Sequence, residues 1–301
     1  MPLLAGGGCT VLAGGTDLYP AHVGRAVVRP LLDITAIEGL RGVRRIASGW
    51  SIGAATTWTD ILRAELPPRL HALQQAAREV GGVQVQNAAT VAGNLCNASP
   101  AADGTPVLMA AGAVAVLRSV AGERRVPVVD FVLGNRRTVR EPHELVVALE
   151  VPDPAATDPA ARSRSVFIKL GGRRYLTISM TMVAVVLDLD RHAAIAAAGI
   201  AVGSCSACAQ RLPRLEAKLL GRPLEAVLAD AVEPEDLAPL APLDDLRASA
   251  GYRLDATQTL LRRALSQLAG AGLFSARASD ALDEIDARTT SASARSRSPA
   301  P

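Results

Sequence analysis

The feature that most constrains how this chain can fold is a pair of short segments rich in small residues. The first is Ala13–Leu18 (AGGTDL) and the second is Thr90–Asn94 (TVAGN). Glycine has no Cβ, so the backbone N–H groups beside it can approach an anion closely. Successive N–H groups in such a turn form a nest that binds phosphate, and Thr16 and Thr90 add hydroxyl donors. Two such loops are predicted to hold a pyrophosphate between them.

Each of these loops is, taken alone, also compatible with an ordinary tight turn. Neither fits the G-x-G-x-x-G fingerprint, so the sequence does not predict a Rossmann dinucleotide site.

Composition narrows the class of protein. The chain has 301 residues, of which 49% are apolar and only 3% aromatic, so it can bury a core but lacks the stacking residues of single-strand nucleic-acid binders. The net charge is +3, and the segment 288–301 contains three arginines and no acidic residue. Without this segment the rest of the chain is nearly neutral. We therefore expect no nucleic-acid partner. A secretory signal and an apolar run of about 20 residues are both missing, which predicts a soluble cytoplasmic protein without a membrane span.

The chain shows no strong acid–base or metal motif. Its four histidines are isolated, and HExxH, GxSxG and P-loop patterns are absent, so we expect no catalytic side chain. Cys205 and Cys208 form a CxxC, but a zinc site would need two further ligands nearby, so no metal site is predicted. This pair fits either two small loop residues or a thioredoxin-like role.

Apolar patterning in the first part of the chain predicts short strands separated by glycines. These strands cover Thr10–Ala13, Leu31–Ile34, Val43–Ile46, Trp50–Ile52, Val114–Leu117 and Val126–Val129. Apolar residues at helical spacing predict helices between them. These helices cover Thr59–Leu66, Leu70–Val80 and Thr105–Ala111.

Pro152–Ala161 (PDPAATDPAA) is rich in Pro, Ala and Asp and predicts a linker. The strands expected beyond it are Ser165–Leu170, Met182–Asp188 and Ala196–Val202. Leucines at helical spacing predict one helix through Leu212–Leu219 and a longer one through Leu254–Leu268. The Ser/Thr/Ala/Arg/Pro composition of residues 287–301 predicts a disordered tail.

Several segments taken together resemble one known family. They are VLAGGTDLYP (Val11–Pro20), NAATVAGNLCNASPAADGTPVLMAAGAVAVL (Asn87–Leu117), VPVVDFVLGN (Val126–Asn135), ELVVALEVP (Glu144–Pro152) and SAGYRLDATQTLLRRAL (Ser249–Leu265). In this order and spacing the chain resembles the FAD-binding subunit of molybdenum hydroxylases, a group that includes xanthine dehydrogenases and carbon monoxide dehydrogenases. The resemblance covers nearly the whole chain except the tail.

The resemblance implies an α+β fold in two parts. Residues 1–155 would form a two-lobed FAD-binding domain of the vanillyl-alcohol-oxidase (PCMH) type. Residues 163–272 would form a smaller α/β domain with a three-stranded antiparallel sheet, similar to the C-terminal domain of carbon monoxide dehydrogenase flavoproteins. Members of the family usually have a strand and a helix ahead of the AGGT loop, whereas twelve residues precede Ala13 here, so the N-terminal lobe is expected to be trimmed.

The resemblance also implies which residues contact FAD. The first loop would wrap the pyrophosphate, and the second would hold phosphate and flavin. Asp103, Val146 and Lys169 match further FAD contacts of the family. The implied cofactor-binding residues are Ala13, Gly14, Gly15, Thr16, Asp17, Leu18, Thr90, Gly93, Asn94, Asp103, Val146 and Lys169.

Three of the residues near these positions have alternative interpretations. Asp103 can accept hydrogen bonds from cofactor hydroxyls or can cap the helix that follows it. Lys169 can balance the charge of a reduced flavin or can be an ordinary surface lysine. Cys96 can be a small buried residue or a group that tunes the flavin from its edge.

The resemblance implies an electron-transfer function. Electrons from a molybdopterin-binding large subunit would pass through [2Fe-2S] centres on a small subunit to FAD on this chain, and then to NAD, a quinone or another acceptor. The expected assembly is a dimer of heterotrimers, with molybdopterin and [2Fe-2S] on the partner subunits. The alternatives are an FAD-free assembly or scaffold subunit of the same complex, and a self-contained flavin oxidase, for which the chain shows no acid–base pair.

Overall fold

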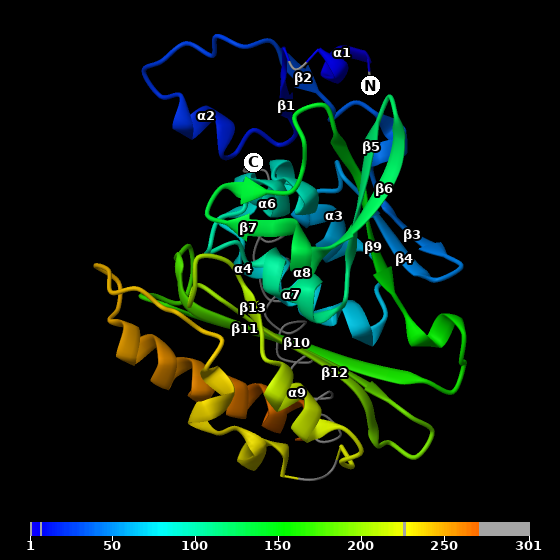
Figure 1. Cartoon of the computed structure of the whole chain (residues 1–301), viewed down its shortest axis with the longest axis vertical. Helices are drawn as coiled ribbons and strands as arrows, with labels where there is room; N and C mark the ends of the chain where they lie inside the picture. Colours follow the sequence, from blue (N-terminus) through cyan, green and yellow to red (C-terminus); the bar gives the residue numbers. More distant parts are fainter. Residues whose placement is uncertain (1, 7, 225–226, 271–301) are drawn as a thin grey trace, which may run out of the picture.

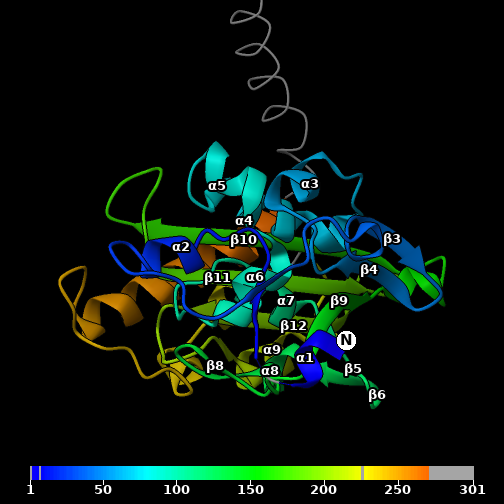
Figure 2. The ribbon, with the colours of Figure 1, turned by 90° about the horizontal axis from the view of Figure 1, so that it is seen from above.

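The computed structural model describes residues 2–6, 8–224 and 227–270 (Figure 1), and the predicted tail at 287–301 lies outside these ranges. The described chain begins with α1 (Pro2–Ala5) and a small parallel pair of strands, β1 (Thr10–Leu12) and β2 (Leu31–Asp33). The short helix α2 (Leu18–Ala21) lies between these strands. A helix and a strand therefore precede the first glycine loop. The N-terminal segment lies across one end of the molecule, above α6 (Figures 1 and 2).

The next module contains a five-stranded antiparallel sheet in the order β3-β4-β9-β5-β6. Its strands are β3 (Val43–Ile46), β4 (Gly49–Gly53), β5 (Val114–Ser119), β6 (Gly122–Pro127) and β9 (Leu145–Pro152). The predicted strands are present, except that β6 ends at Pro127 and the short helix α8 (Val128–Phe131) takes over. The hairpin of β7 (Val132–Gly134) and β8 (Arg137–Thr138) follows α8.

Five α-helices lie between β4 and β5 in the sequence, and those with buried side chains share a hydrophobic core cluster with this sheet. They are α3 (Trp58–Arg63), α4 (His71–Glu79), α5 (Val83–Ala88), α6 (Val91–Asn97) and α7 (Gly104–Ala110). A capping box begins α3, because the Thr57 hydroxyl accepts from the Asp60 amide at 3.1 Å and the Asp60 carboxylate accepts from the Thr57 amide at 2.9 Å. The three helices predicted for this region are confirmed, with small differences at their ends.

The prediction that Thr90–Asn94 forms a loop is wrong, because helix α6 begins at Val91. The Thr90 hydroxyl accepts the amide N–H of Gly93 at 2.9 Å, which is the bond of a helix N-cap. A Cβ on Gly93 would lie 2.7 Å from that hydroxyl, so glycine here permits the cap to close. The cap outweighs the low helix propensity of glycine.

The second module is built on an antiparallel sheet in the order β10-β11-β12-β13. Its strands are β10 (Arg162–Gly171), β11 (Ser179–Leu189), β12 (Ile195–Gly203) and β13 (Gln210–Arg211). The expected three-stranded sheet is corrected to four strands, because the two residues of β13 pair with Ala201 and Val202 of β12. The predicted linker carries the 3-10 turn η3 (Pro154–Ala156) between β9 and β10.

Both faces of the long strands β10, β11 and β12 are covered by helices (Figure 1). On one face, Phe167, Met182 and Ala201 belong to the same core cluster as the helices of the first module. On the other face, the sheet packs against α9 (Pro213–Leu219) and a long helix over residues 250–270, both of which were predicted. The two modules therefore share a hydrophobic core.

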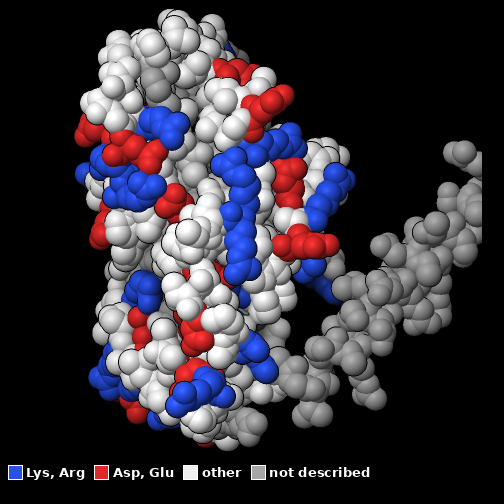
Figure 3. Space-filling view, turned by 90° about the vertical axis from the view of Figure 1, so that its right-hand side faces the viewer, with Lys and Arg blue, Asp and Glu red and all other residues white. Residues whose placement is uncertain are grey.

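Ion pairs join side chains on the outer surface of the first sheet, both within one strand and across the intervening strand β5. Arg125 on β6 pairs with Glu123 of the same strand at 2.9 Å and with Glu150 on β9 at 3.2 Å. Basic and acidic side chains are interspersed on the side of the molecule where β5 and β6 lie (Figure 3). Among the residues that the structure describes, no helix combines the length and apolar character needed to cross a membrane.

Candidate functional site

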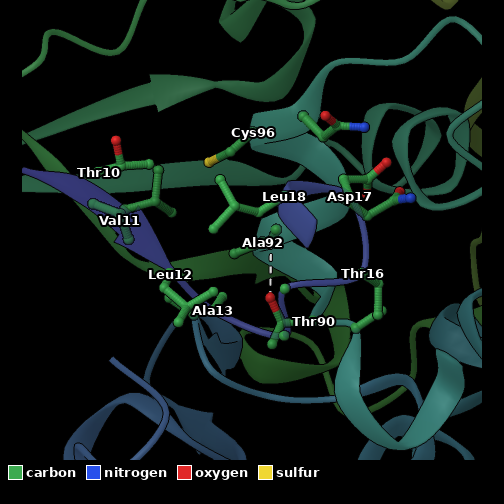
Figure 4. Close-up of a pocket in the computed structure, with 18 of the residues that line it drawn as sticks. Thr10, Val11, Leu12, Ala13, Thr16, Asp17, Leu18, Thr90, Ala92 and Cys96 are labelled. Atoms are coloured by element: carbon green, nitrogen blue, oxygen red, sulfur yellow. Dashed lines mark hydrogen bonds between the residues drawn. The ribbon is translucent and has the colours of Figure 1, made fainter. Parts of the chain in front are cut away.

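A cavity of about 1010 Å³ lies between the N-terminal segment and α6. Its volume matches the upper end of the range typical of sites for small ligands and cofactors, roughly 300–1,000 Å³. Ten of the twelve residues predicted to bind FAD line it. They are Ala13, Gly14, Gly15, Thr16, Asp17, Leu18, Thr90, Gly93, Asn94 and Val146. Folding thus brings the two glycine-containing segments to the same cavity (Figure 4).

The first loop requires glycine at two positions. A Cβ on Gly14 would lie 1.9 Å from the carbonyl oxygen of Ala88, because the loop passes directly against the chain that leads into α6. Gly15 has a φ of +69°, in the left-handed region that favours glycine. Within the described part of the chain, no hydrogen bond joins the amide N–H groups of residues 14–17 to another protein group. These donors are available to a ligand.

The second segment, Thr90–Asn94, forms the start of α6 and lines the cavity with Thr90, Gly93 and Asn94. The Asn94 side-chain oxygen accepts the amide of Gly104 at 3.2 Å, which ties α6 to the start of α7. Trp58, at the start of α3, also lines the cavity, and its buried indole N–H has no hydrogen-bond partner among the described residues. Sequence reasoning missed Trp58, since a buried tryptophan is usually a core residue with no further role.

Cys96 projects from α6 into the cavity region, near Val11 and Leu18 (Figure 4). Burial raises the pKa of the Cys96 thiol to about 11, although the nearby charge of Arg140 acts in the opposite direction. The residue therefore borders the site as a neutral thiol at physiological pH.

We expect Cys96 to resist alkylation in the native protein. At about pH 8, roughly one thiol in a thousand is the reactive thiolate when the pKa is near 11. Peptide mass spectrometry after a short iodoacetamide treatment should show unmodified Cys96 in the folded chain and modified Cys96 in urea. Rapid native labelling would contradict the raised pKa.

Asp103 and Lys169 are not among the residues that line the cavity, and the structure instead pairs them with each other. Lys169 Nζ lies 2.7 Å from a carboxylate oxygen of Asp103, and the other oxygen accepts the Ser179 hydroxyl at 2.9 Å. Burial raises the pKa of Asp103, while the charge and hydrogen bond of Lys169 act against this rise.

The structure excludes one of the two interpretations of Lys169 and of Asp103, and leaves their contact with FAD as a prediction. Lys169 is not a surface lysine, because its side chain is only 5% exposed. Asp103 occupies the N-cap position of α7, but its side chain makes no capping bond. The pair joins the start of α7 to β10 of the second module.

Comparison with known families agrees with this arrangement of two modules. Residues 3–154 match the family model described as the FAD-binding domain in molybdopterin dehydrogenase. Residues 167–268 match the model of the carbon monoxide dehydrogenase flavoprotein C-terminal domain. The chain belongs to the molybdopterin dehydrogenase FAD-binding family. The resemblance indicated by the sequence motifs is confirmed at the level of the family, and relatives in this family are oxidoreductase subunits.

Relatives in this family match over most of their length. A putative xanthine dehydrogenase FAD-binding subunit of Escherichia coli (strain K12) is 30% identical over 87% of this chain and 89% of its own length. The carbon monoxide dehydrogenase medium chain of Hydrogenophaga pseudoflava is 29% identical over 87% of this chain and 89% of its own.

Solved structures of the family have the same fold. A structure of carbon monoxide dehydrogenase from Hydrogenophaga pseudoflava that lacks the Mo-pyranopterin moiety superimposes with a TM-score of 0.77 and 31% identity, over 88% of this chain and 91% of that one. A reconstituted carbon monoxide dehydrogenase from Oligotropha carboxidovorans gives a TM-score of 0.80 at 27% identity, over 89% and 93%.

Cys205 and Cys208, the two cysteines of the CxxC, do not line the cavity. Cys205 is buried and contacts the hydroxyls of Thr181 and Thr257 at 3.2 and 3.3 Å, and Cys208 is also a free thiol. No group of three or more potential metal-ligating side chains gathers anywhere in the described ranges.

Proposed function

We propose that this chain binds FAD in the cavity below the N-terminal segment and serves as the electron-transfer subunit of a molybdopterin-dependent hydroxylase or dehydrogenase. The observation that carries the proposal is the loop of residues 14–17, which presents unbonded amide donors to a cavity of cofactor size in a chain of this family. A run of free backbone N–H groups suits a pyrophosphate.

The residues present fit FAD on one further ground. The orphaned N–H of Trp58 is a donor that a ligand acceptor beside it would satisfy.

In this role, the protein holds and orients the cofactor while the cofactor carries the redox chemistry. Bound FAD would accept electrons from partner subunits and pass them to NAD, a quinone or another acceptor. The first loop would bind the diphosphate through its amides, and Val146 and Leu18 would cover apolar parts of the cofactor. Contact of FAD with Asp103 and Lys169 stays a prediction.

We further propose the finer organisation that the sequence suggested. The first domain, residues 1–155, would be of the vanillyl-alcohol-oxidase (PCMH) type, and residues 163–272 would form the second. A molybdopterin-binding large subunit and a [2Fe-2S] small subunit would be the partners, in a cytoplasmic dimer of heterotrimers. The medium-chain name of a relative supports an assembly of several subunits.

The first test is the absorbance spectrum of the purified full chain before and after FAD is added, for the wild type and for Gly14→Ala. We expect flavin bands in the wild type and at least a 10-fold weaker affinity in the variant, because its methyl group would collide with the Ala88 carbonyl and displace the loop.

Gly39→Ala is the matched control, since a Cβ there meets nothing within 4 Å. It should bind FAD as the wild type does. A wild-type chain that binds no flavin would overturn the electron-transfer proposal and favour the FAD-free scaffold subunit. If Gly14→Ala and Gly39→Ala bound FAD with equal affinity, the first loop would not contribute to FAD binding.

A further inference from the structure

The cavity wall is strongly basic. Arg29, Arg136, Arg137 and Arg140 all line it, whereas Asp17 is the one acidic residue in the lining, so the wall carries three net positive charges with His22 neutral. Among the ion pairs within the described ranges, none involves these four arginines. Their charges are therefore not compensated by protein carboxylates, although the nearly neutral chain supplies carboxylates to many arginines elsewhere.

Arg140 is held in place without being neutralised. Its Nη1 donates to the carbonyl oxygens of Glu141 at 2.9 Å and Glu144 at 2.8 Å. The Glu144 carboxylate is occupied by Arg124, whose Nε lies 2.6 Å from it. The charge of Arg140 acts on the thiol of Cys96, which also lines the cavity. A partly buried guanidinium fixed by neutral carbonyls keeps donors for an anion that is not part of the protein.

Arg136 is fixed by a strained backbone. Its φ is +55°, a conformation that is uncommon for residues other than glycine, asparagine and aspartate. The strain is supported by α6, because the Arg136 amide donates to Ala98 O at 2.9 Å and its Nη1 donates to the Asn97 side chain at 3.1 Å. Strain of this kind persists only where the surrounding structure holds the residue in place.

From these contacts we propose that Arg136 and Arg140 bind the diphosphate of the dinucleotide through their side chains. This inference rests on the proposed FAD site and extends it from backbone amides to two specific arginines on the β7–β8 hairpin and the segment after it. Arginine suits this role because its planar guanidinium donates to phosphate oxygens in pairs. Both side chains are held by uncharged hydrogen-bond acceptors, so neither positive charge is neutralised before a ligand binds.

The test uses the full chain and three ligands: FAD, ADP and riboflavin. ADP carries the diphosphate without the flavin, and riboflavin carries the flavin without phosphate. We expect Arg140→Gln to weaken FAD and ADP by about 10- to 100-fold, as removal of a charge-assisted hydrogen bond does, and to leave riboflavin unchanged. Arg136→Gln should act in the same direction, and Arg140→Lys should restore part of the loss.

Arg44→Gln is the matched control, because Arg44 lies exposed on β3, outside the cavity. Thermal unfolding of each variant separates weaker binding from poor folding. Unchanged FAD and ADP affinity in folded Arg140→Gln and Arg136→Gln would overturn the inference, as would a loss confined to riboflavin. A wild-type chain that binds ADP, with the expected losses in the arginine variants, but does not bind FAD would give a different result. The inferred phosphate site would then be supported and the proposed function would be wrong.

Discussion

Replacing Arg69 with methionine is expected to lower the free energy of unfolding by about 3–5 kcal/mol, as removal of one partner from a buried ion pair does. Arg69 lies in the turn before α4, and it pairs with the buried carboxylate of Asp188 on β11. Its Nε also donates to Pro152 O at 2.8 Å, and its Nη2 donates to Ala111 O at 3.1 Å. One guanidinium thus joins both modules, and its loss leaves Asp188 with only the Ser163 hydroxyl.

Urea unfolding followed by circular dichroism measures this effect. The double variant Arg69→Met with Asp188→Asn should recover part of the loss, because the uncompensated charge is gone. Arg41→Met is the matched surface control, since Arg41 is half exposed in its pair with Asp60 and should change stability by about 1 kcal/mol or less. Equal losses for Arg69→Met and Arg41→Met would show that the buried pair has no special role.

Replacing Lys169 with methionine is expected to destabilise the chain by a similar amount, about 3–5 kcal/mol near neutral pH. The change leaves the Asp103 carboxylate buried with only Ser179 beside it. Burial already raises the pKa of Asp103, and the loss of Lys169 raises it further. A carboxyl with a raised folded pKa binds its proton more tightly when folded, so the stability of the variant falls as pH rises above the ordinary Asp pKa of about 3.9.

Unfolding curves at about pH 5 and about pH 8 test both the size and the sign. The deficit of Lys169→Met relative to the wild type should be larger at the higher pH. Asp103→Asn together with Lys169→Met should remove this pH dependence, because no titrating carboxyl remains at the site. A deficit that grows toward acidic pH would mean that Asp103 does not carry the effect.

Local signals predicted most secondary-structure elements, and ten of the twelve residues that the family resemblance assigned to FAD line the cavity. The strands Val43–Ile46 and Trp50–Ile52 could be predicted because they are short segments with β-branched or aromatic residues, bounded by glycines. The first glycine loop could be located for a related reason, since its shape depends on Gly14 and Gly15 themselves. The resemblance to the family then connected this loop to Thr90 and Val146.

Features that depend on distant parts of the chain could not be predicted from patterns. Asp103 and Lys169 are separated by 66 positions, and only the packing of β10 against the helices of the first module brings them together. The start of α6 was misjudged because Gly93 signals a loop by propensity, while the Thr90 cap acts only once the helix forms. The arginines after β7 stand close together in the sequence, but nothing local indicates that they face the cavity.

The shared core has a consequence for how such subunits can diverge. Both faces of β10, β11 and β12 are buried, one of them against helices of the other module. At one contact, a Cβ on Gly199 of β12 would lie 1.9 Å from the carbonyl oxygen of Ala110 in α7. A genetic exchange that replaced the C-terminal half with that of a distant relative would bring together surfaces that had not been selected to fit. The two halves are therefore expected to be inherited together.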